Sequence, residues 1–286
     1  MSILIELLKS LVYGVIQGIT EWLPISSTGH LILLNTVMPL NLYPDASANL
    51  AFWNMYKVVI QLGSILAVIA AFRSKLWPFD PKRSQARQKQ IIRLWLLILI
   101  ATIPVGIIGF LLNDIIDEKL STPAVVGVTL LIYGIIFILV EQKPKAPVIN
   151  STAEITPKAA VITGLFESLA LIPGTSRSGS TIIGSLLLGM NRPTATEFSF
   201  YLAIPAMIGA SLLKLVKMKI TLGLSGILVL LVGMASAYIV SVVVLHSLLR
   251  YVRKNSFRLF GAYRIILGLL ILILALIGAF PEGIGV

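Results

Sequence analysis

The sequence predicts an all-α, polytopic integral membrane protein with about six transmembrane helices and two re-entrant helical hairpins. Hydrophobic residues make up 57% of the 286 residues, and only 12% are charged. That share of charge is about half of what a soluble domain usually carries. Long apolar runs without charge recur along the chain, and alternating strand patterns are absent, which disfavours a β-barrel.

Charge and cysteine content narrow the class further. The net charge of +11 sits mostly in loops beside apolar helices, where it sets membrane topology, so we expect no nucleic-acid partner. The chain has no cysteine, which excludes disulfides and thiolate metal sites. Residues 1–20 carry Glu6 and Lys9 and lack a small-residue cleavage site, so we expect no cleaved signal peptide.

The first half begins with two short helices, expected at 3–20 and 28–38 and separated by Pro24. Each is shorter than the ~20 apolar residues of a full span, so the pair predicts a re-entrant hairpin. Three spans follow a polar loop. We expect them at about 51–72, 91–112 (kinked at Pro104) and 122–141, with a short acidic loop of Asp114, Asp117 and Glu118 before the third.

The second half repeats this order after a proline-containing linker at 142–157. Short helices are expected at 158–171 and 178–189, and three spans at about 195–216, 222–248 and 258–280. Local residues match as well: Gly14 to Gln17 aligns with Gly164 to Glu167, and Pro24-x-Ser-Ser aligns with Pro173-x-Thr-Ser. We therefore predict one membrane domain, 1–286, built from a first repeat at 1–145 and a second repeat at 155–286.

A repeat with an odd number of spans inverts the second copy in the bilayer. The basic loops at 73–93 and 250–258 are then cytoplasmic under the positive-inside rule, and both termini are outside. The hairpins enter from opposite faces, and their tips meet near the midplane. Three lysines on the outer side are exceptions to the rule: Lys214, Lys217 and Lys219.

The first hairpin carries an acid and an amide before its break. Gln17 and Glu21 are spaced i, i+4 and so share one helix face. A carboxylate inside a bilayer is costly and normally has a partner or a function. Glu21 is therefore a candidate catalytic residue, with a structural hydrogen bond as the alternative.

Hydroxyls and a histidine follow the break. Ser26, Ser27 and Thr28 stand where a helix can begin, and such hydroxyls often only cap it. His30 lies three residues after Ser27, within reach of a nucleophile–base contact. Because histidine titrates near neutral pH, Ser27 and His30 are candidates for catalysis, and Ser26 and Thr28 for phosphate binding.

The second hairpin carries the more specific signal. Its break is followed by a helix start, whose free N–H groups bind anions, and by Arg177, whose planar fork suits phosphate oxygens. A structural ion pair with Glu21 or Glu167 is the alternative role for this arginine. The candidate phosphate ligands around Arg177 are small or hydroxyl residues: Gly174, Thr175, Ser176, Ser178, Gly179 and Thr181.

Glu167 is the repeat counterpart of Gln17 and leaves two roles open. With Gln17 and Glu21 it can hold a divalent cation, Mg²⁺ or Ca²⁺, through oxygen ligands, or it only orients Arg177. Two positively charged side chains, Lys57 and Arg264, also lie within predicted spans. We expect structural roles for both, with Lys57 reaching the outer interface and Arg264 the cytoplasmic one.

The runs QGITEWLPISSTGH at 17–30 and PGTSRSGST at 173–181, with FSFYLAIPA at 198–206, resemble the undecaprenyl-diphosphatase family of bacterial membranes, also called bacitracin resistance proteins. The resemblance implies hydrolysis of a polyprenyl diphosphate lipid, undecaprenyl diphosphate, to the monophosphate and inorganic phosphate, in the plasma (inner) membrane with a site open to the outer face. That step recycles the lipid carrier for cell-wall synthesis. The family's first motif carries over as Gln17 and Glu21; because its first position is glutamine here, a two-carboxylate reading of that motif alone fails.

Two mechanisms and a rival class stay open at this point. Either Ser27, deprotonated by His30, attacks the terminal phosphorus, or water attacks directly with His30 or Glu21 as base. The rival is a transporter or flippase for phosphate or a lipid phosphate, because inverted repeats with broken helices are a transporter architecture. A carrier needs no nucleophile–base pair, which favours the enzyme. The oligomeric state is left open, with a homo-oligomer as one alternative.

Overall fold

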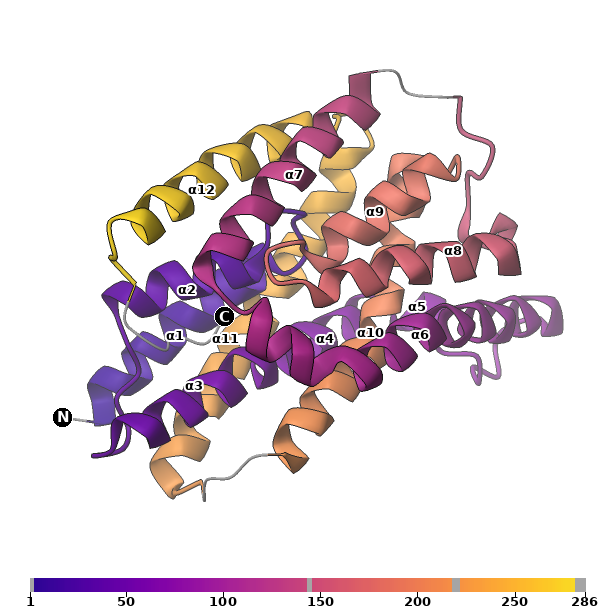
Figure 1. Ribbon diagram of the computed structural model, residues 1–286. Coiled ribbons are helices and arrows are strands. Elements are labelled where there is room, and N and C mark those ends of the chain that lie inside the picture. Colours follow the sequence, from indigo (N-terminus) through magenta and orange to yellow (C-terminus); the bar gives the residue numbers. More distant parts are fainter. Residues whose placement is uncertain (1–2, 143–145, 218–221, 281–286) are drawn as a thin grey trace.

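A computed structural model describes residues 3–142, 146–217 and 222–280 (Figure 1). Lys219 lies outside the described residues. Within them the chain is all-α, apart from turns and one isolated bridge between Ile149 and Met190.

The helices follow the predicted order closely. The first half contains α1 (Ile3–Thr20), α2 (Ser27–Val37), α3 (Ala46–Val59), α4 (Gln61–Ala71), α5 (Arg73–Leu76), α6 (Gln85–Lys119) and α7 (Pro123–Gln142). The second contains the short 3-10 helix η1 (Thr152–Glu154), α8 (Pro157–Ser168), the 3-10 helix η2 (Leu169–Leu171), α9 (Arg177–Leu187), α10 (Arg192–Val216), α11 (Leu224–Val252) and α12 (Arg258–Leu276).

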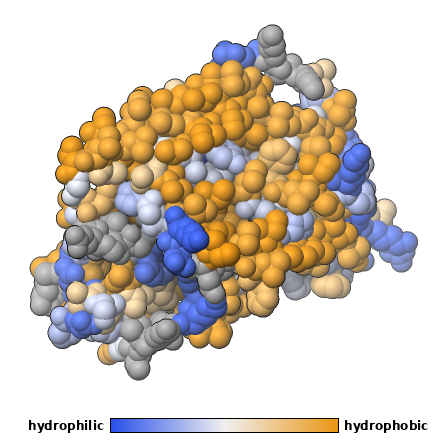
Figure 2. All heavy atoms as spheres, in the orientation of Figure 1, coloured by the Kyte–Doolittle hydropathy of each residue, from blue (hydrophilic) through white to orange (hydrophobic). Residues whose placement is uncertain are grey.

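Seven helical stretches in the described part are long and apolar enough to cross a membrane. Six correspond to the expected spans, and the seventh is α1, which the sequence placed in a hairpin. Figure 2 shows apolar residues over most of the visible face, with hydrophilic residues mainly toward its ends. This surface belongs to a multi-pass membrane protein, because lipid takes the place of water around the apolar belt.

One expected boundary is wrong, and one expected span contains a break that was not predicted. The first span, found as Ala46–Ala71, is two helices, α3 and α4, that meet at Ile60. The expected acidic loop is helical: α6 continues to Lys119 and includes Glu118, whereas the side chains of Asp114 and Asp117 are outside the description. No proline or glycine follows Gly109 before Pro123, so nothing in the backbone chemistry stops the helix at 112.

The two limbs of each hairpin lie side by side. In the first hairpin (α1 and α2), the Tyr13 hydroxyl donates to the Asn35 side chain at 3.2 Å and to the Met38 carbonyl at 3.0 Å. In the second hairpin (α8, η2 and α9), Ser180 donates to the Phe166 carbonyl. In each hairpin the second helix thus runs back along the first. The re-entrant course through a bilayer stays a prediction.

Glycines allow close packing at matching places in the two halves. A Cβ on Gly14 of α1 would lie 2.3 Å from the Gly233 carbonyl oxygen of α11, and one on Gly164 of α8 would lie 1.9 Å from that of Ala101 in α6. Gly134 and Gly261 face each other where α7 and α12 run together (Figure 1). A Cβ on either glycine would lie 2.8 Å from the carbonyl oxygen of the other. These contacts have the symmetry that an inverted repeat requires, although the repeat boundaries stay a prediction.

Candidate active site

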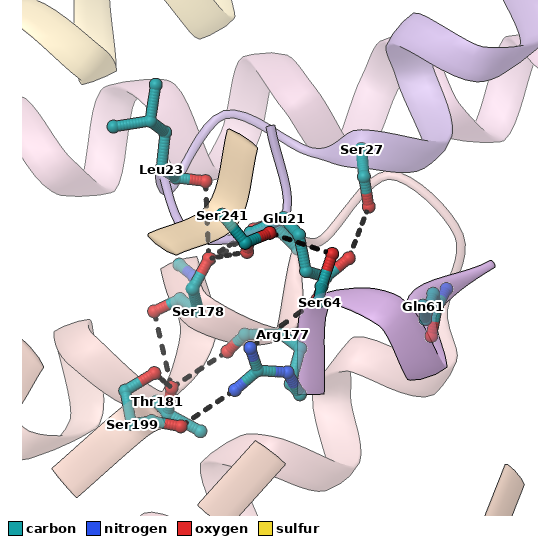
Figure 3. Close-up of polar contacts among 12 residues, drawn as sticks. Glu21, Leu23, Ser27, Gln61, Ser64, Arg177, Ser178, Thr181, Ser199 and Ser241 are labelled. Carbon is teal, nitrogen blue, oxygen red and sulfur yellow. Dashed lines mark hydrogen bonds and ion pairs between the residues drawn. The ribbon is translucent and has the colours of Figure 1, made fainter. Parts of the chain in front are cut away.

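The tips of the two hairpins, residues 21–26 and 172–176, lie against each other. Nη2 of Arg177, just past the second tip, is 3.4 Å from Oε1 of Glu21 in the first, and both side chains are nearly buried (Figure 3). Ser178 also crosses to the first tip, where its hydroxyl lies 3.3 Å from the carbonyl oxygens of Glu21 and Leu23. The contact expected between the tips is therefore present.

One serine in each tip has an unusual backbone. Ser26 has φ of 73° and Ser176 has φ of 68°, the only non-glycine residues with positive φ in the described part. Each accepts a hydrogen bond from a glycine N–H three residues on, Gly29 at 3.3 Å and Gly179 at 3.2 Å. A left-handed serine costs on the order of 1–2 kcal/mol and commonly marks a functional turn.

This geometry corrects the sequence alignment of the tips. Because Ser26 and Ser176 occupy equivalent positions, Ser27 corresponds to Arg177, not to Ser176. The two tips therefore place different chemistry at the first position of equivalent helices, a hydroxyl in one half and a guanidinium in the other.

Arg177 is fixed on three sides. Nη1 donates to the Ser199 carbonyl of α10 at 2.8 Å, Nη2 faces Glu21, and the guanidinium lies 5.6 Å from the Trp22 ring centre. Its Nε is buried and has no hydrogen-bond partner in the described part. An arginine held in this way presents donors in a fixed fork, the geometry that phosphate oxygens accept.

Ser27 does not contact His30, contrary to the expected pair. Its hydroxyl donates instead to Oε2 of Glu21 at 2.9 Å, and Gln17 Nε2 donates to the same oxygen at 2.9 Å. His30 turns away: Nδ1 is 2.7 Å from the Ser26 carbonyl, and Nε2 is 2.8 Å from the Tyr263 hydroxyl. Since a carbonyl only accepts, Nδ1 carries the proton, and the neutral ring accepts from Tyr263. The acceptor for the Ser27 proton is thus Glu21.

The other expected phosphate ligands divide into two groups. Thr181 and Ser178 are occupied within the protein, Thr181 with Ser199 at 2.6 Å and Ser178 with the first tip. The Thr175 hydroxyl, by contrast, is buried without a partner in the described part. Thr28 lines an open cavity beside the tips. Gly174 has φ of +87°, and a Cβ there would lie 2.1 Å from Thr129, so glycine is required at this turn.

Arg264 is the main residue that sequence reasoning misjudged. It is fully buried and does not reach the interface. Nη1 donates to the Pro24 carbonyl of the first tip at 3.2 Å, and Nη2 donates to the Gly174 and Thr175 carbonyls of the second at 3.0 and 2.9 Å. One guanidinium therefore joins both tips from α12. The signal was present, because a charged residue in mid-span is functional by default.

The residues predicted to bind a divalent cation carry oxygen atoms, the ligand type that such a cation requires. Oε1 of Gln17 and both carboxylate oxygens of Glu167 are buried without hydrogen-bond partners in the described part, and oxygen is the ligand that Mg²⁺ and Ca²⁺ take. The oxygens of Glu21 are already bound by Arg177, Ser27 and Gln17. In the described residues no three acidic, histidine or cysteine side chains gather as a metal cluster. A cation held by these oxygens would need further oxygens from a ligand or from water to complete its coordination.

Comparison with known proteins gives a consistent result. A family model described as bacitracin resistance protein BacA matches residues 10–270. Undecaprenyl-diphosphatase 1 of Clostridioides difficile (strain 630) is 48% identical over 271 residues, covering 94% of this chain and 96% of that protein. Undecaprenyl-diphosphatase of Lachnoclostridium phytofermentans is 46% identical over 269 residues, and that of Enterococcus faecalis is 45% identical over 277, with at least 93% of each chain covered.

Proposed function

The chain belongs to the bacitracin resistance protein BacA family, and from that membership we propose that it hydrolyses undecaprenyl diphosphate to undecaprenyl phosphate and inorganic phosphate. Relatives that bear the name undecaprenyl-diphosphatase match nearly the whole chain. The reaction recycles the lipid carrier of cell-wall synthesis and so confers resistance to bacitracin.

One observation carries the proposal at the level of chemistry. The carboxylate of Glu21 is bound at the same time by the Ser27 hydroxyl and by the Arg177 guanidinium, which come from different hairpins. A nucleophile, a proton acceptor and an anion ligand thus lie within one set of hydrogen bonds. A structural ion pair alone would not require the hydroxyl on the second oxygen.

The steps follow from these contacts. Arg177 and the N–H groups at the start of α9 bind the terminal phosphate and stabilise the charge that develops on its oxygens. The Ser27 oxygen attacks the terminal phosphorus, and its proton passes to Glu21. The phosphorus–oxygen bond of the anhydride breaks, and undecaprenyl phosphate leaves. Water then attacks the phosphoserine, inorganic phosphate leaves, and the serine regains its proton.

Direct attack by water is the second version of the reaction. In it, Glu21 or His30 removes the proton of the water, and Ser27 only binds the phosphate. The Ser27–Glu21 hydrogen bond favours the serine route. In either version His30, bonded to the Ser26 carbonyl and to Tyr263, holds the strained turn that aims Ser27.

A divalent cation, Mg²⁺ or Ca²⁺, belongs to the proposal. Gln17, Glu21 and Glu167 would hold it, and when bound it would offset the negative charge of the diphosphate. Of these three, Glu167 has the stronger claim, because neither of its buried oxygens has a protein donor in the described part.

We place the protein in the bacterial plasma membrane with the site open to the outer face. Lys75 in the first basic loop pairs with Glu197 near the start of α10, which supports a cytoplasmic position for that end of α10. The cavity beside the hairpin tips includes Lys214, near the opposite end of the same helix. The position of Lys214 therefore favours a cavity that opens away from the cytoplasm.

Release of inorganic phosphate from undecaprenyl diphosphate by the pure protein in detergent tests the proposal. Detergent removes any gradient, so a transporter would release nothing. We expect turnover by the wild type, and 32P-phosphoserine at position 27 when the reaction with terminally labelled substrate is quenched in acid. Undiminished turnover by Ser27→Ala would exclude the serine route, and no turnover by the wild type would exclude the function.

A further inference from the structure

A cavity of about 300 Å³ adjoins the two hairpin tips. Its lining includes Thr28, the neighbour of Ser27, and Pro173 of the second tip. Gln61, at the start of α4, also lines it. The cavity therefore borders both hairpin tips, through Thr28 next to Ser27 and through Pro173.

Two lysines from different helices line this cavity, Lys57 in the last turn of α3 and Lys214 in the last turn of α10. A hydrogen bond ties the two turns together, because the Ser211 hydroxyl donates to the Val58 carbonyl at 3.2 Å. Ser211 is one turn before Lys214, and Val58 follows Lys57 directly. The two ammonium groups are thus carried by a braced pair of helix ends.

These lysines stand where topology gives no reason for them. Positive charge is expected on the cytoplasmic side, and Lys214 is an exception to that rule. Lys57 lies within a membrane-spanning stretch, where a cation is costly and normally serves a site. A cavity that receives an anion from the outer side accounts for both.

The walls of the cavity differ in character. Lys57, Lys214 and Gln61 form a polar side, whereas Leu31, Ile32 and Leu171 present apolar surface. A small, fully ionic ligand would leave that apolar side without a partner. A diphosphate attached to a hydrocarbon chain matches both sides at once.

We propose that Lys57 and Lys214 bind the lipid-linked phosphate of the diphosphate while Arg177 binds the terminal phosphate. This inference rests on the proposed function and adds the residues that bind the phosphate that stays on the lipid. Lysine suits the role, since a mobile point charge tolerates the change of position of the leaving phosphate better than a rigid fork.

The test measures kcat and KM for a polyprenyl diphosphate in detergent micelles at low and high ionic strength. The variant is Lys57→Met with Lys214→Met, and the matched control is Lys217→Met, an exposed lysine three residues beyond Lys214 that does not line the cavity. For the double variant we expect KM to rise about tenfold with kcat nearly unchanged, because the charge involved is already present in the bound substrate. The rise should shrink at high salt, and Lys57→Arg with Lys214→Arg should restore KM.

Four other outcomes are informative. A double variant with the KM of the wild type, in a preparation that turns over normally, overturns the inference and leaves the function intact. An equal rise in Lys217→Met overturns it too, because the effect would then be a general surface charge. If the methionine variant does not fold, Lys214→Gln alone decides, and an unchanged KM counts against the proposal. A wild type that releases no phosphate refutes the proposed function itself.

Discussion

Arg177 meets a carboxylate, a backbone carbonyl and an aromatic face at the same time. Glu21 and Trp22 of the first tip and Ser199 of α10 supply these groups, and none of them lies on α9, the helix that carries Arg177. The guanidinium fork can keep the Ser199 bond while another N–H group turns to a phosphate. The donors of a lysine all lie on one nitrogen atom, so they do not reach two acceptors as far apart as those of the guanidinium fork. The shape of the arginine side chain therefore matters here as well as its charge.

We therefore expect Arg177→Lys to lower turnover about 100-fold or more while the protein remains folded. The same change at Arg250, an exposed residue at the end of α11, is the control and should leave turnover unchanged. Phosphate release and thermal unfolding in detergent are measured on both. Turnover within a factor of about three of the wild type in Arg177→Lys would show that the fork is not needed.

Glu167 allows a test of the cation. A chelator should stop phosphate release, and added Mg²⁺ or Ca²⁺ should restore it. In Glu167→Gln the cation concentration for half-maximal activity should rise about tenfold or more, since a charged oxygen ligand becomes a neutral one. Glu154→Gln, at the exposed end of η1, should match the wild type. Full activity in excess chelator would remove the cation from the mechanism.

At the scale of elements, the breaks between the hairpin helices could be predicted from the positions of prolines and glycines. Pro24 and the Pro173-Gly174 pair separate the hairpin limbs where expected. The break between α3 and α4 at Ile60 has no such residue, so local sequence could not reveal it. Gly63, three residues after this break, packs closely on α11, since a Cβ there would be 2.0 Å from the Met234 carbonyl oxygen. Gln61, directly after the break, lines the cavity next to the hairpin tips. Packing between helices, not propensity, decides this element.

Close helix packing by glycine gives an expectation for stability. In Gly164→Ala the new methyl group would overlap the Ala101 backbone, so α8 and α6 must separate, at a cost of about 1–3 kcal/mol in unfolding free energy. Gly209→Ala, within α10, meets nothing within 4 Å and should be neutral or stabilise the helix by up to ~1 kcal/mol. Thermal unfolding of the two variants in detergent compares them; equal midpoints would show that the α8–α6 contact is not tight.

At the scale of the whole molecule, topology can be tested with few changes because the chain has no cysteine. Ser47→Cys lies in an exposed position at the start of α3, and Asn255→Cys lies in the basic loop before α12. We expect a membrane-impermeant maleimide to label Ser47→Cys in intact cells and Asn255→Cys only after the inner membrane is opened. The reverse pattern would invert the protein and put the cavity in the cytoplasm.

The sequence predicted the hairpins, the long spans and the residues of both tips, because each is a local pattern or an internal repeat. It could not predict that Ser27 binds Glu21 instead of His30, since the positive φ of Ser26 decides that direction. Nor could it place Arg264, which reaches the first tip across 240 positions of sequence. Contacts between distant spans depend on how the halves pack, which no run of residues records.

The central claim is that the two tips form one active centre, and a double-mutant cycle between them tests it most directly. Glu21→Gln, Arg177→Lys and the double variant are compared by kcat/KM for phosphate release. Because both residues act on the same phosphate and contact each other, we expect the double variant to retain at least about ten times more activity than the product of the two single losses. Losses that multiply in full would mean that the residues act independently, and the shared centre would be wrong.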